Sequence, residues 1–416
     1  MSLKPLPRVG AANPSIGIRK EDLLTERRAA LSPDNVKQLV HNGFTVFVER
    51  SSQRIFEDAS YERNGATLLD SLHQAPVLSL VFGIKEIKID KLRPGQDYAC
   101  FSHTIKGQEN NMPLLRAMID GKHALLDYEC IRNTEGKRLV FFGFHAGVAG
   151  AVNSLWAFGQ RKEKSAFTQL KQCRHYHDIS EIKATLSDLD AAQHAPISIA
   201  ILGTGNAGQG AASILDCLPP NLAQVKQYAV ADLYRHRATG TFDRKDYLEN
   251  PDAYDSIFRK DLDRYDIILN CIYWEKKYPK LVTTQDLSLL YGQQNPPKLH
   301  VIGDISCDVG GSIEVTSKVT WPDDPCYEYD AVDHRVVSSI ASPPRGPTIM
   351  AVYNLPAEVP RDASIFFGNT LCPLLIAEKP NIQQQQWGQL LEPLRSAFIL
   401  LNGQLQPKYT YLAHHV

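Results

Sequence analysis

The sequence predicts an α/β protein with parallel sheets, and three observations lead to this prediction. Short apolar runs alternate with helical patterns from residue 15 onward, which is typical of strands joined by crossover helices. The run 77–84 is almost continuously apolar, as expected of a strand buried on both faces of a parallel sheet. A second pattern of the same kind begins at Ile197, and 416 residues are enough for two or three domains at about 150 residues each.

The expected elements of the first half follow one another closely. Ser32 and Pro33 supply an N-cap and a first-turn proline for a helix, and Gly43 stands where that helix should end. Residues 44–48 alternate as a strand does. The other expected elements here are strands at 15–19, 97–102, 123–128 and 139–142, with helical segments at 108–120 and 145–160.

The second half repeats the alternation and then ends in helical patterns. Residues 234–265 are polar and charged, and we expect them to form an excursion from the minimal fold. The expected strands are 197–202, 227–231, 266–272 and 300–305, and the expected C-terminal helices are 361–375 and 387–401.

Composition excludes several classes of function. Lys and Arg total 45 against 46 Asp and Glu, so no net field attracts nucleic acid or an anionic membrane. No apolar run reaches the ~20 residues that span a bilayer. The eight cysteines are scattered without a Cys-x-x-Cys pair, which indicates reduced thiols and no metal site. We therefore expect a cytoplasmic protein without a nucleic-acid or membrane partner.

A glycine-rich loop predicts a nucleotide site. Gly203, Gly205 and Gly208 form a Gly-x-Gly-x-x-Gly pattern between the strand at 197–202 and an apolar helix. The glycines allow a tight turn, a close approach of the backbone to a pyrophosphate, and close packing of helix on strand. The helix N-terminus adds unpaired N–H groups for the phosphates. A lone glycine motif is weak evidence, but this context favours a dinucleotide.

The acid expected after the next strand is Asp232. It lies near the ~20-residue spacing at which a carboxylate hydrogen-bonds the adenosine ribose. A carboxylate there repels a 2′-phosphate and favours NAD. Arg235, His236 and Arg237 follow directly, and an arginine near this position accepts that phosphate in NADP enzymes. NAD is the expected cofactor, and NADP stays open.

Charged residues at strand ends of the first domain predict a chemical site. Lys85 follows the apolar run 77–84, and His103 follows the strand at 97–102. Both side chains titrate near neutrality in suitable surroundings, which suits proton transfer in amine–imine chemistry. Arg28 and Arg138 are candidates for holding substrate carboxylates in bidentate fashion. Taken singly, each of these residues is as well explained by a solvated or structural role.

Together these segments resemble the alanine dehydrogenase/saccharopine dehydrogenase superfamily. Within it they are most similar to the lysine-forming saccharopine dehydrogenases and to the lysine–2-oxoglutarate reductase half of the bifunctional lysine-degrading synthase. The blocks that carry the resemblance are GIRKE at 17–21, ERRAALSP at 26–33, GIKE at 83–86, FSHTIKGQ at 101–108, LDYE at 126–129, FGFHAGVAG at 142–150, NCIYW at 270–274, DISCD at 304–308, GGSIE at 310–314 and NLP at 354–356. Several blocks in one order are more specific than any single motif.

The resemblance implies two Rossmann-like domains with the active site in the cleft between them. The first would be a discontinuous substrate domain, 1–145 plus 350–416, and the second a dinucleotide-binding domain, 146–349. Lys85 and His103 match the family's acid–base pair, and Glu86 and Glu129 are expected to modulate their pKa values. The matched substrate-binding residues are Arg28, Gln108, Arg138, Phe142, Asp304 and Ser306. The matched cofactor-binding residues are Gly203, Gly205, Asn206, Ala207, Gly208, Asp232, His236, Tyr273, Tyr353, Asn354 and Leu355.

The implied reaction interconverts saccharopine with lysine and 2-oxoglutarate through hydride transfer at a secondary amine. One position departs from the family pattern, because Tyr353 stands where the saccharopine enzymes usually have an aspartate near the cofactor. A phenol supplies no fixed negative charge at neutral pH. Two alternatives therefore stay open: an amino-acid dehydrogenase of the alanine dehydrogenase kind, and a non-catalytic nucleotide-binding sensor. The sequence predicts no oligomeric state.

Overall fold

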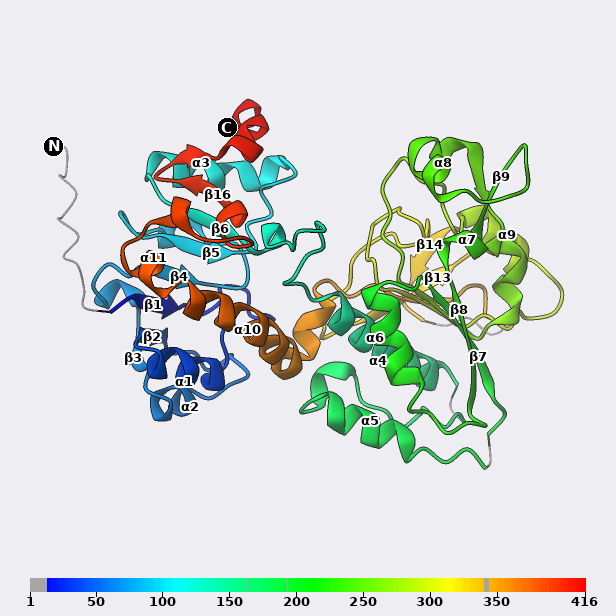
Figure 1. The fold of residues 1–416 in the computed structure, drawn as a ribbon. Helices are drawn as coiled ribbons and strands as arrows, with labels where there is room; N and C mark the ends of the chain where they lie inside the picture. The colour runs from blue at the N-terminus through cyan, green and yellow to red at the C-terminus, as the bar shows by residue number, and fades with distance from the viewer. Residues whose placement is uncertain (1–12, 163, 193, 340–343) are drawn as a thin grey trace. The chain divides into compact units, whose positions relative to one another are not determined.

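The computed structural model describes residues 13–162, 164–192, 194–339 and 344–416. These residues fall into two compact units (Figure 1). Unit 1 runs to Phe141 and resumes at Pro360–Val416, whereas unit 2 is the continuous segment Phe142–Val359. In the described parts of the chain, no helix combines the length and the apolar character needed to cross a membrane.

Unit 1 is built on one mixed sheet in the order β17-β16-β6-β5-β4-β1-β2-β3. The strands from β6 to β3 run parallel, and β16 joins β6 in the antiparallel direction. Its strands are β1 (Ser15–Ile18), β2 (Thr45–Glu49), β3 (Thr67–Leu69), β4 (Leu80–Phe82), β5 (Tyr98–Cys100), β6 (Leu125–Asp127), β16 (Phe398–Leu401) and β17 (Gln404–Leu405). The strand order reverses between β1 and β4, which is where open α/β sheets bind ligands.

The C-terminal segment completes the core of unit 1. The first helix begins as predicted, because the Ser32 hydroxyl accepts from the backbone N–H of Asn35 and Pro33 occupies the first turn. A later helix packs on it, and its Ser364 hydroxyl accepts from the N–H of Ala29 at 2.9 Å. The helices of unit 1 are α1 (Pro33–His41), α2 (Asp58–Arg63), α3 (Met112–Asp120), α10 (Pro360–Ala377) and α11 (Lys379–Gln383).

Two predictions for unit 1 are wrong. The expected strand at 139–142 is irregular, and only an isolated bridge joins Arg138 to Arg132. The expected helix at 387–401 is replaced by two short 3-10 turns and strand β16. Pro393 has no backbone N–H to continue a helix, and the apolar residues of β16 instead pair with β6.

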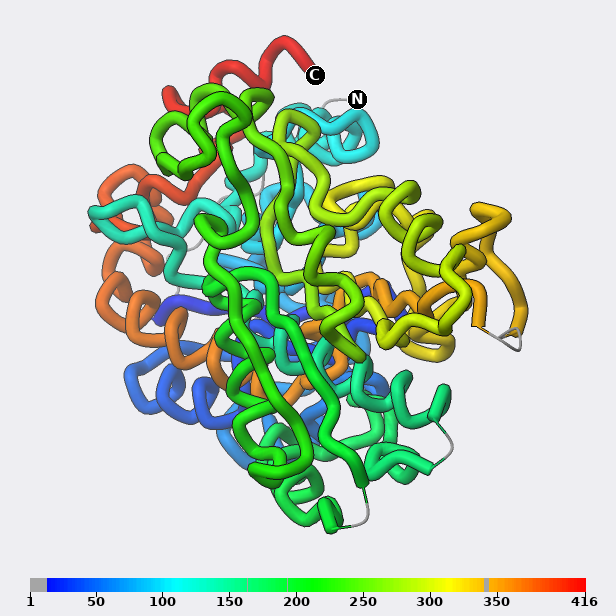
Figure 2. The backbone as a smooth tube through the Cα atoms, turned by 90° about the vertical axis from the view of Figure 1, so that its right-hand side faces the viewer, coloured from blue at the N-terminus to red at the C-terminus, as the bar shows by residue number. Residues whose placement is uncertain are grey.

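Unit 2 carries a second mixed sheet in the order β14-β13-β15-β12-β11-β7-β8. The run from β15 to β8 is parallel, and β13 and β14 add an antiparallel edge. Figure 2 shows β7 and β8 as neighbouring green tubes. The strands are β7 (Ile197–Leu202), β8 (Ala223–Tyr228), β11 (Ile267–Asn270), β12 (Val301–Asp304), β13 (Cys326–Asp330), β14 (Arg335–Val337) and β15 (Thr348–Met350).

Two helices of unit 2 pack unusually closely (Figure 1). They are α4 (Gly143–Arg161), expected from the small-residue pattern, and α6 (Asn206–Leu215), which follows the glycine loop. A Cβ added at Gly147 would lie 1.8 Å from the Ala207 carbonyl, and one at Gly210 would lie 1.9 Å from the Phe144 carbonyl. The remaining helices are α5 (Ile179–Ser187), α7 (Val230–Leu233), α8 (Arg244–Glu249) and α9 (Thr284–Tyr291).

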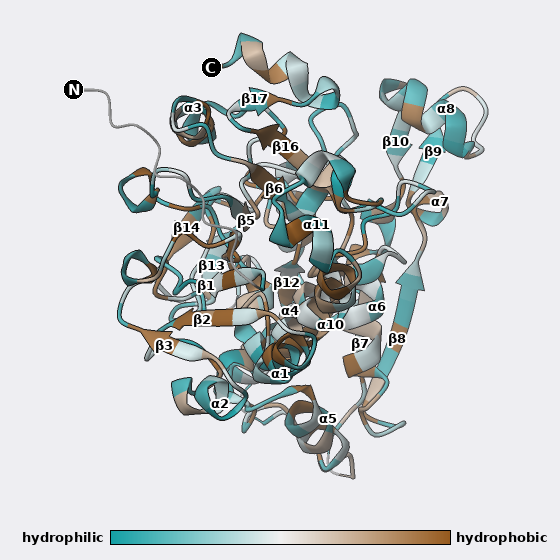
Figure 3. Ribbon diagram, turned by 60° about the vertical axis from the view of Figure 1, so that its left-hand side comes forward, coloured by the Kyte–Doolittle hydropathy of each residue, from teal (hydrophilic) through white to brown (hydrophobic). Residues whose placement is uncertain are grey.

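The predicted strand at 227–231 is misplaced. The strand itself is β8, which ends at Tyr228, and the next residues form the short helix α7. Residues 224–227 are exposed at the sheet edge, and β8 is largely hydrophilic in Figure 3. An exposed edge strand lacks the apolar signal on which the prediction depended.

The polar excursion 234–265 has structure of its own. Strands β9 (Tyr234–His236) and β10 (Tyr254–Ser256) pair antiparallel, and α8 lies between them in sequence. The rings of Tyr234, Tyr247 and Tyr254 are buried and in contact. Tyrosine thus supplies the core that aliphatic residues provide elsewhere.

Candidate active site

Lys85 and His103 lie at the same edge of the unit 1 sheet. Each stands three residues beyond the end of its strand, Lys85 after β4 and His103 after β5. Because β4 and β5 are parallel neighbours, both side chains belong to the carboxyl edge of the sheet. Burial lowers the pKa of the His103 imidazole, and the ammonium of Lys85 lowers it further.

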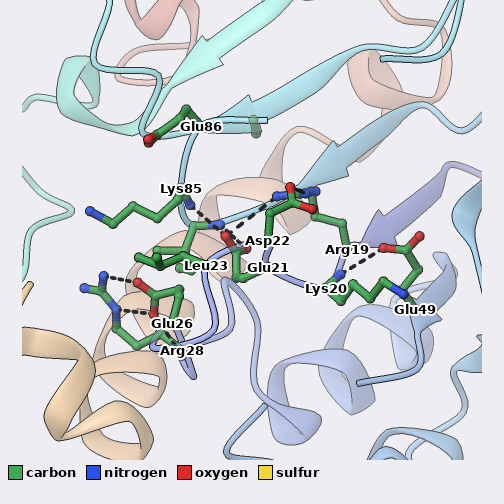
Figure 4. A network of polar contacts seen from close by, with 12 residues as sticks. Arg19, Lys20, Glu21, Asp22, Leu23, Glu26, Arg28, Glu49, Lys85 and Glu86 are labelled. Carbon is green, nitrogen blue, oxygen red and sulfur yellow. Dashed lines mark hydrogen bonds and ion pairs between the residues drawn. The ribbon is translucent and has the colours of Figure 1, made fainter. Parts of the chain in front are cut away.

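A buried carboxylate holds the backbone at Lys85. The Glu21 side chain accepts from the N–H of Ile84 at 2.7 Å and from the N–H of Lys85 at 3.0 Å. Burial lowers the pKa of the Lys85 ammonium, and the guanidinium of Arg28 lowers it further, against the opposing charges of Glu26, Glu86 and Glu21. Figure 4 shows the Lys85 side chain directed away from Glu21. A lysine with a lowered pKa is suited to exchange a proton near neutral pH.

Arg28 is held by a bidentate ion pair. Its Nε donates to Glu26 Oε1 at 2.8 Å and its Nη2 donates to Glu26 Oε2 at 2.6 Å, as drawn in Figure 4. Arg28 is only 4% exposed and Glu26 only 1%. The Glu26 carboxylate therefore occupies the Nε–Nη2 edge of the guanidinium and fixes the plane of the cation, on the same segment as Glu21.

His103 sits on strained backbone that its neighbours stabilise. Its φ of 54° is in the left-handed region, which costs about 1–3 kcal/mol for a residue other than glycine. The Ser102 N–H donates to Asp127 Oδ2 at 3.1 Å, the Ser102 hydroxyl donates to the same carboxylate, and the Thr104 hydroxyl lies 2.8 Å from the Ser102 hydroxyl. Both neighbours of the strained histidine are therefore tied to one buried carboxylate.

Electrostatic contacts connect His103 to the other candidates. Its Nε2 lies 3.9 Å from Glu86 Oε2. Burial and the Lys85 charge lower the pKa of the imidazole, while Glu86 and Glu129 raise it. Glu129 in turn forms an ion pair with Arg138 at 2.8 Å. Arg28, Lys85, Glu86, His103, Glu129 and Arg138 thus form one linked set of charges in unit 1.

Asp127 is a central residue that the sequence argument missed. It is the last residue of β6, is fully buried, and also accepts from the Glu129 N–H at 2.8 Å. Burial raises its pKa to about 6. It therefore positions His103 on one side and Glu129 on the other. The available signal was an aspartate that ends the apolar segment 124–126.

Two predicted substrate residues lie on other elements of the chain. Gln108 is exposed and precedes a short 3-10 turn, Glu109–Asn111. Phe142 caps helix α4 and belongs to unit 2, where its ring contacts His145.

The glycine loop has the geometry expected of a dinucleotide-binding turn. Gly203 has a φ of 113°, and a Cβ at Gly208 would lie 2.1 Å from the Gly203 carbonyl. Gly205 caps helix α6, and a Cβ there would meet no described atom within 4 Å. Asn206 and Ala207 open the helix, where unpaired N–H groups attract phosphate. The loop therefore leaves open space at Gly205 and none at Gly208.

Asp232 and His236 have local partners beyond β8. The Asp232 carboxylate is exposed, lies in α7 and accepts from the Ala229 N–H at 2.8 Å. His236 lies in β9, and its Nδ1 accepts from the N–H groups of Ala238 and Thr239. Asp232 thus lies in a helix and not at the end of a strand, because strand β8 ends at Tyr228, earlier than predicted.

The ends of β11 and β12 form a buried polar network. The Asp304 carboxylate accepts from Asn270 Nδ2 at 2.9 Å, from Ser306 Oγ at 2.7 Å and from Thr316 Oγ1 at 2.6 Å. Burial raises the pKa of Asp304. Asp304 itself is fully buried, whereas Ser306 is partly exposed. Asp304 therefore fixes the conformation of the turn from inside, and Ser306 is the residue of this network that is accessible from outside.

Aromatic side chains are exposed near the same strand ends. Tyr273, after β11, is 66% exposed and donates to Glu275 Oε1 at 2.7 Å. Tyr353, after β15, is partly exposed and makes an edge contact with Trp321. Asn354 adopts the left-handed conformation, whereas the Leu355 side chain is buried in the core. In the described residues, no group of three or more His, Cys, Asp or Glu side chains could hold a metal ion.

Family profiles match both parts of the chain. The profile described as alanine dehydrogenase/PNT, N-terminal domain, matches residues 17–149, and the profile of the C-terminal domain matches residues 189–407, more than half of the chain. The chain belongs to the alanine dehydrogenase/PNT family. This is a family of oxidoreductases whose C-terminal domain binds NAD(P).

Relatives of this alanine dehydrogenase/PNT family member include enzymes of two lengths. The mitochondrial alpha-aminoadipic semialdehyde synthase of Rattus norvegicus is 32% identical, over 96% of this chain and 47% of the synthase. The chain therefore spans about half the length of that relative. The saccharopine dehydrogenase (NAD(+), L-lysine-forming) of Neurospora crassa is 28% identical, over 86% of this chain and 90% of the dehydrogenase.

A solved structure supports the fold. An L-alanine dehydrogenase superposes with a TM-score of 0.64 at 18% identity, over 96% of this chain and 99% of the other. This confirms the predicted α/β class, with two mainly parallel mixed sheets and an alanine dehydrogenase-like fold.

Proposed function

We propose that this chain is an NAD(P)-dependent oxidoreductase that interconverts saccharopine with L-lysine and 2-oxoglutarate. The observation that carries the proposal is the linked set of charges at the carboxyl edge of the unit 1 sheet, in which Lys85 and His103 have lowered pKa values beside two arginines. The relatives named above, a saccharopine dehydrogenase and a semialdehyde synthase, support the substrate class.

The proposed division of labour follows the two units. Unit 1 binds the substrate, and unit 2 binds the dinucleotide at the Gly203–Gly208 loop, with Asp232 favouring NAD over NADP. The dinucleotide supplies hydride transfer when bound. Arg28 and Arg138 hold carboxylates of a substrate that carries several of them.

Proton transfer is the proposed task of Lys85 and His103. Oxidation of the secondary amine removes a hydride from carbon and a proton from nitrogen and leaves an imine on the substrate. Water then adds to the imine carbon and gives up a proton while the nitrogen takes one up. The carbinolamine next passes its hydroxyl proton to the nitrogen as the C–N bond breaks, which releases lysine and 2-oxoglutarate. A neutral amine and a neutral imidazole accept these protons, and the lowered pKa values of Lys85 and His103 favour their neutral forms.

The test is oxidation of NADH by the purified protein with 2-oxoglutarate, measured by absorbance with and without lysine. The proposal expects oxidation only when lysine is present, saccharopine as the product, and NAD reduction when saccharopine is added. Oxidation with pyruvate and ammonia instead would identify an amino-acid dehydrogenase of the alanine dehydrogenase kind. NADH binding without turnover on any of these substrates would indicate a sensor, and it would contradict the proposed role of Lys85 and His103.

A further inference from the structure

Helix α10 of unit 1 begins at the edge of the sheet that carries the candidate active site. It lies beside α1 (Figure 1). Ala29 donates its N–H to Ser364 Oγ at 2.9 Å, and Asn35 Nδ2 donates to Asn369 Oδ1 at 2.9 Å. The residue numbers of both partners rise together, so the two helices run in the same direction. Because α1 connects the parallel strands β1 and β2, its N-terminus lies at the carboxyl edge of the sheet, and so does the first turn of α10.

Aromatic side chains of α10 contact three segments of the candidate site. The Phe367 ring centroid lies 6.0 Å from that of Phe101 and 4.8 Å from that of Tyr128. The Phe366 ring centroid lies 5.5 Å from that of Phe141. Each of these three partners stands within three residues of a member of the linked set of charges. Helix α10 is therefore a common support for the segments that carry those charges.

Arg361, in the first turn of α10, carries a positive charge without a carboxylate partner. Its guanidinium carbon lies 5.4 Å from the centroid of the buried Phe56 ring. Phe56 follows Ile55, whose N–H donates to the Arg27 carbonyl at 2.9 Å, so the guanidinium lies beside the segment that precedes α1. Its Nε is buried, whereas Nη1 and Nη2 are accessible, and in the described parts of the chain none of these nitrogens forms an ion pair or a hydrogen bond. A guanidinium that rests on an aromatic ring with both terminal nitrogens accessible is suited to bidentate binding of a carboxylate.

The two arginines already assigned to substrate carboxylates each have a glutamate of their own. Arg28 forms the bidentate pair with Glu26, and Arg138 pairs with Glu129 at 2.8 Å. Arg361 therefore adds a positive charge at this edge that the carboxylates of the described residues do not neutralise. Saccharopine carries three carboxylates, so a third cation at the site has a matching group on the substrate.

Next to Arg361, helix α10 exposes an apolar surface. Ile365 is 39% exposed and Phe366 is 37% exposed. Ile365 stands four residues after Arg361, so the two side chains are neighbours on one face of the helix. The acidic Asp362 points about 100° away around the helix. An aliphatic chain whose carboxylate binds Arg361 would lie along this apolar surface. The lysine moiety of saccharopine has such a chain of four methylenes, whereas the 2-oxoglutarate moiety has only two.

We propose that Arg361 binds the α-carboxylate of the lysine moiety of the substrate, with Nη1 and Nη2 as donors and with Ile365 and Phe366 against the methylene chain. This inference rests on the proposed function, which supplies lysine and saccharopine as the substrates. Arg361 then determines specificity, because it selects an amine that bears a carboxylate at the far end of its chain over an amine of the same length without one.

The test is steady-state NADH oxidation by the full chain with 2-oxoglutarate and either lysine or cadaverine, which is lysine without its α-carboxylate. The wild type should use lysine with a kcat/KM at least about tenfold above that for cadaverine. Arg361→Gln should raise KM for lysine at least about tenfold, keep KM for 2-oxoglutarate within about twofold, and remove the preference for lysine over cadaverine. Arg63→Gln changes an exposed arginine of α2 and is the matched control, which should leave all of these values unchanged. A purely structural role of Arg361 would not alter the choice between lysine and cadaverine.

A second variant and a second measurement keep the test decisive. Arg361→Met keeps an apolar stem on Phe56 and replaces Arg361→Gln if that variant does not fold. Calorimetric titration with saccharopine needs no turnover, and either variant should weaken this binding at least about tenfold.

The outcomes separate the role of Arg361 from the proposed function. If the wild type turns over lysine and the variant retains both the KM for lysine and the preference for lysine, the role of Arg361 is overturned and the proposed function stands. If the wild type shows no lysine-dependent turnover, the proposed function is contradicted. The role of Arg361 is then overturned as well if the wild type does not bind saccharopine, or if the variant binds it equally well.

Discussion

Lys85 and His103 are held in different ways, and the difference governs what substitutions there should do. Lys85 depends on a carboxylate, Glu21, that fixes its backbone from another segment. His103 depends on its own neighbours, Ser102 and Thr104, which hold a left-handed backbone through Asp127. Replacing either titrating side chain removes a proton acceptor and leaves those supports in place.

Lys85→Met and His103→Gln should therefore each lower kcat by about 10²–10⁴-fold. NADH affinity should stay unchanged, because the dinucleotide loop lies in unit 2. Steady-state kinetics and NADH fluorescence titration measure the two quantities. Lys88→Met changes an exposed lysine nearby and serves as the matched control. Equal turnover in all four proteins would remove Lys85 and His103 from the reaction.

The pH profile should identify His103 as a base. Burial and the Lys85 charge place its pKa below the ordinary value of 6.5, so the imidazole is neutral at neutral pH. Activity that needs the neutral imidazole rises with pH through that pKa. The rate of saccharopine oxidation should therefore show an acidic limb below about pH 6.5. His103→Gln should abolish that limb, and its persistence would assign it to another group.

Ser102→Ala tests the support beneath His103. Loss of the hydroxyl removes one link from Asp127 and should lower kcat about tenfold through misplacement of the imidazole, with KM nearly unchanged. Thr104→Ser keeps its hydroxyl and is the conservative control. An unchanged kcat together with lower stability in denaturant would show that the network only stabilises the fold.

At the scale of elements, two glycines near the same loop should respond differently to alanine. A methyl at Gly210 would meet the Phe144 carbonyl at 1.9 Å and force α4 and α6 apart, whereas Gly205 has open space around it. Gly210→Ala should lower the free energy of unfolding by about 1–3 kcal/mol. Gly205→Ala should leave stability unchanged and weaken NADH binding at least about tenfold, because the backbone can no longer approach the pyrophosphate. Urea unfolding and NADH titration separate these effects, and a stable Gly210→Ala would contradict the packing argument.

Helix α4 also meets a buried acid on the turn Leu355–Glu358. Glu358 is 2% exposed, and its Oε2 accepts from Asn153 Nδ2 at 2.9 Å. Burial raises its pKa from 4.5 to about 7. The folded state therefore binds this proton more tightly than the unfolded state does. Stability should fall as pH rises from about 4.5 to about 7, by on the order of 3 kcal/mol at most.

Glu358→Gln removes that loss. The variant should match the wild type near pH 5 and should be more stable by about 1–3 kcal/mol near pH 8, as measured by urea unfolding at both values. Ser187→Ala, on an exposed position of α5, controls for general effects of pH. A difference that is the same at both values would show that ionisation of Glu358 does not contribute.

At the scale of the whole molecule, the two units differ in how the chain builds them. Unit 2 is one continuous segment, whereas unit 1 needs its C-terminal part, since α10 packs on α1 and β16 extends the sheet. All proposed dinucleotide contacts lie in unit 2.

A fragment of residues 142–359 should therefore fold by itself and bind NADH within about tenfold of the full chain. Circular dichroism, a cooperative thermal transition and NADH fluorescence measure this. A fragment of residues 1–141 should fail to fold, because it lacks α10 and β16. An unfolded 142–359 fragment would show that unit 2 depends on the rest of the chain.

The sequence by itself determined the features that local patterns encode. Ser32, Pro33 and Gly43 marked the first helix, the glycine spacing at 203–208 marked the nucleotide loop, and continuous apolar runs marked the interior strands. Capping, turn geometry and hydrophobic period depend on residues a few positions apart, so a single sequence displays them.

Only the tertiary structure decided what distant residues do together. Strand β16 stands where a helix was expected, because its apolar residues pair with β6. The predicted position of β8 was wrong, because an exposed edge strand needs no apolar pattern. Asp127 and Glu21 became supports of the candidate site only when folding brought them to Ser102 and Lys85. The partners of a buried charge are chosen by packing across the sheet, and that choice leaves no local signal in the sequence.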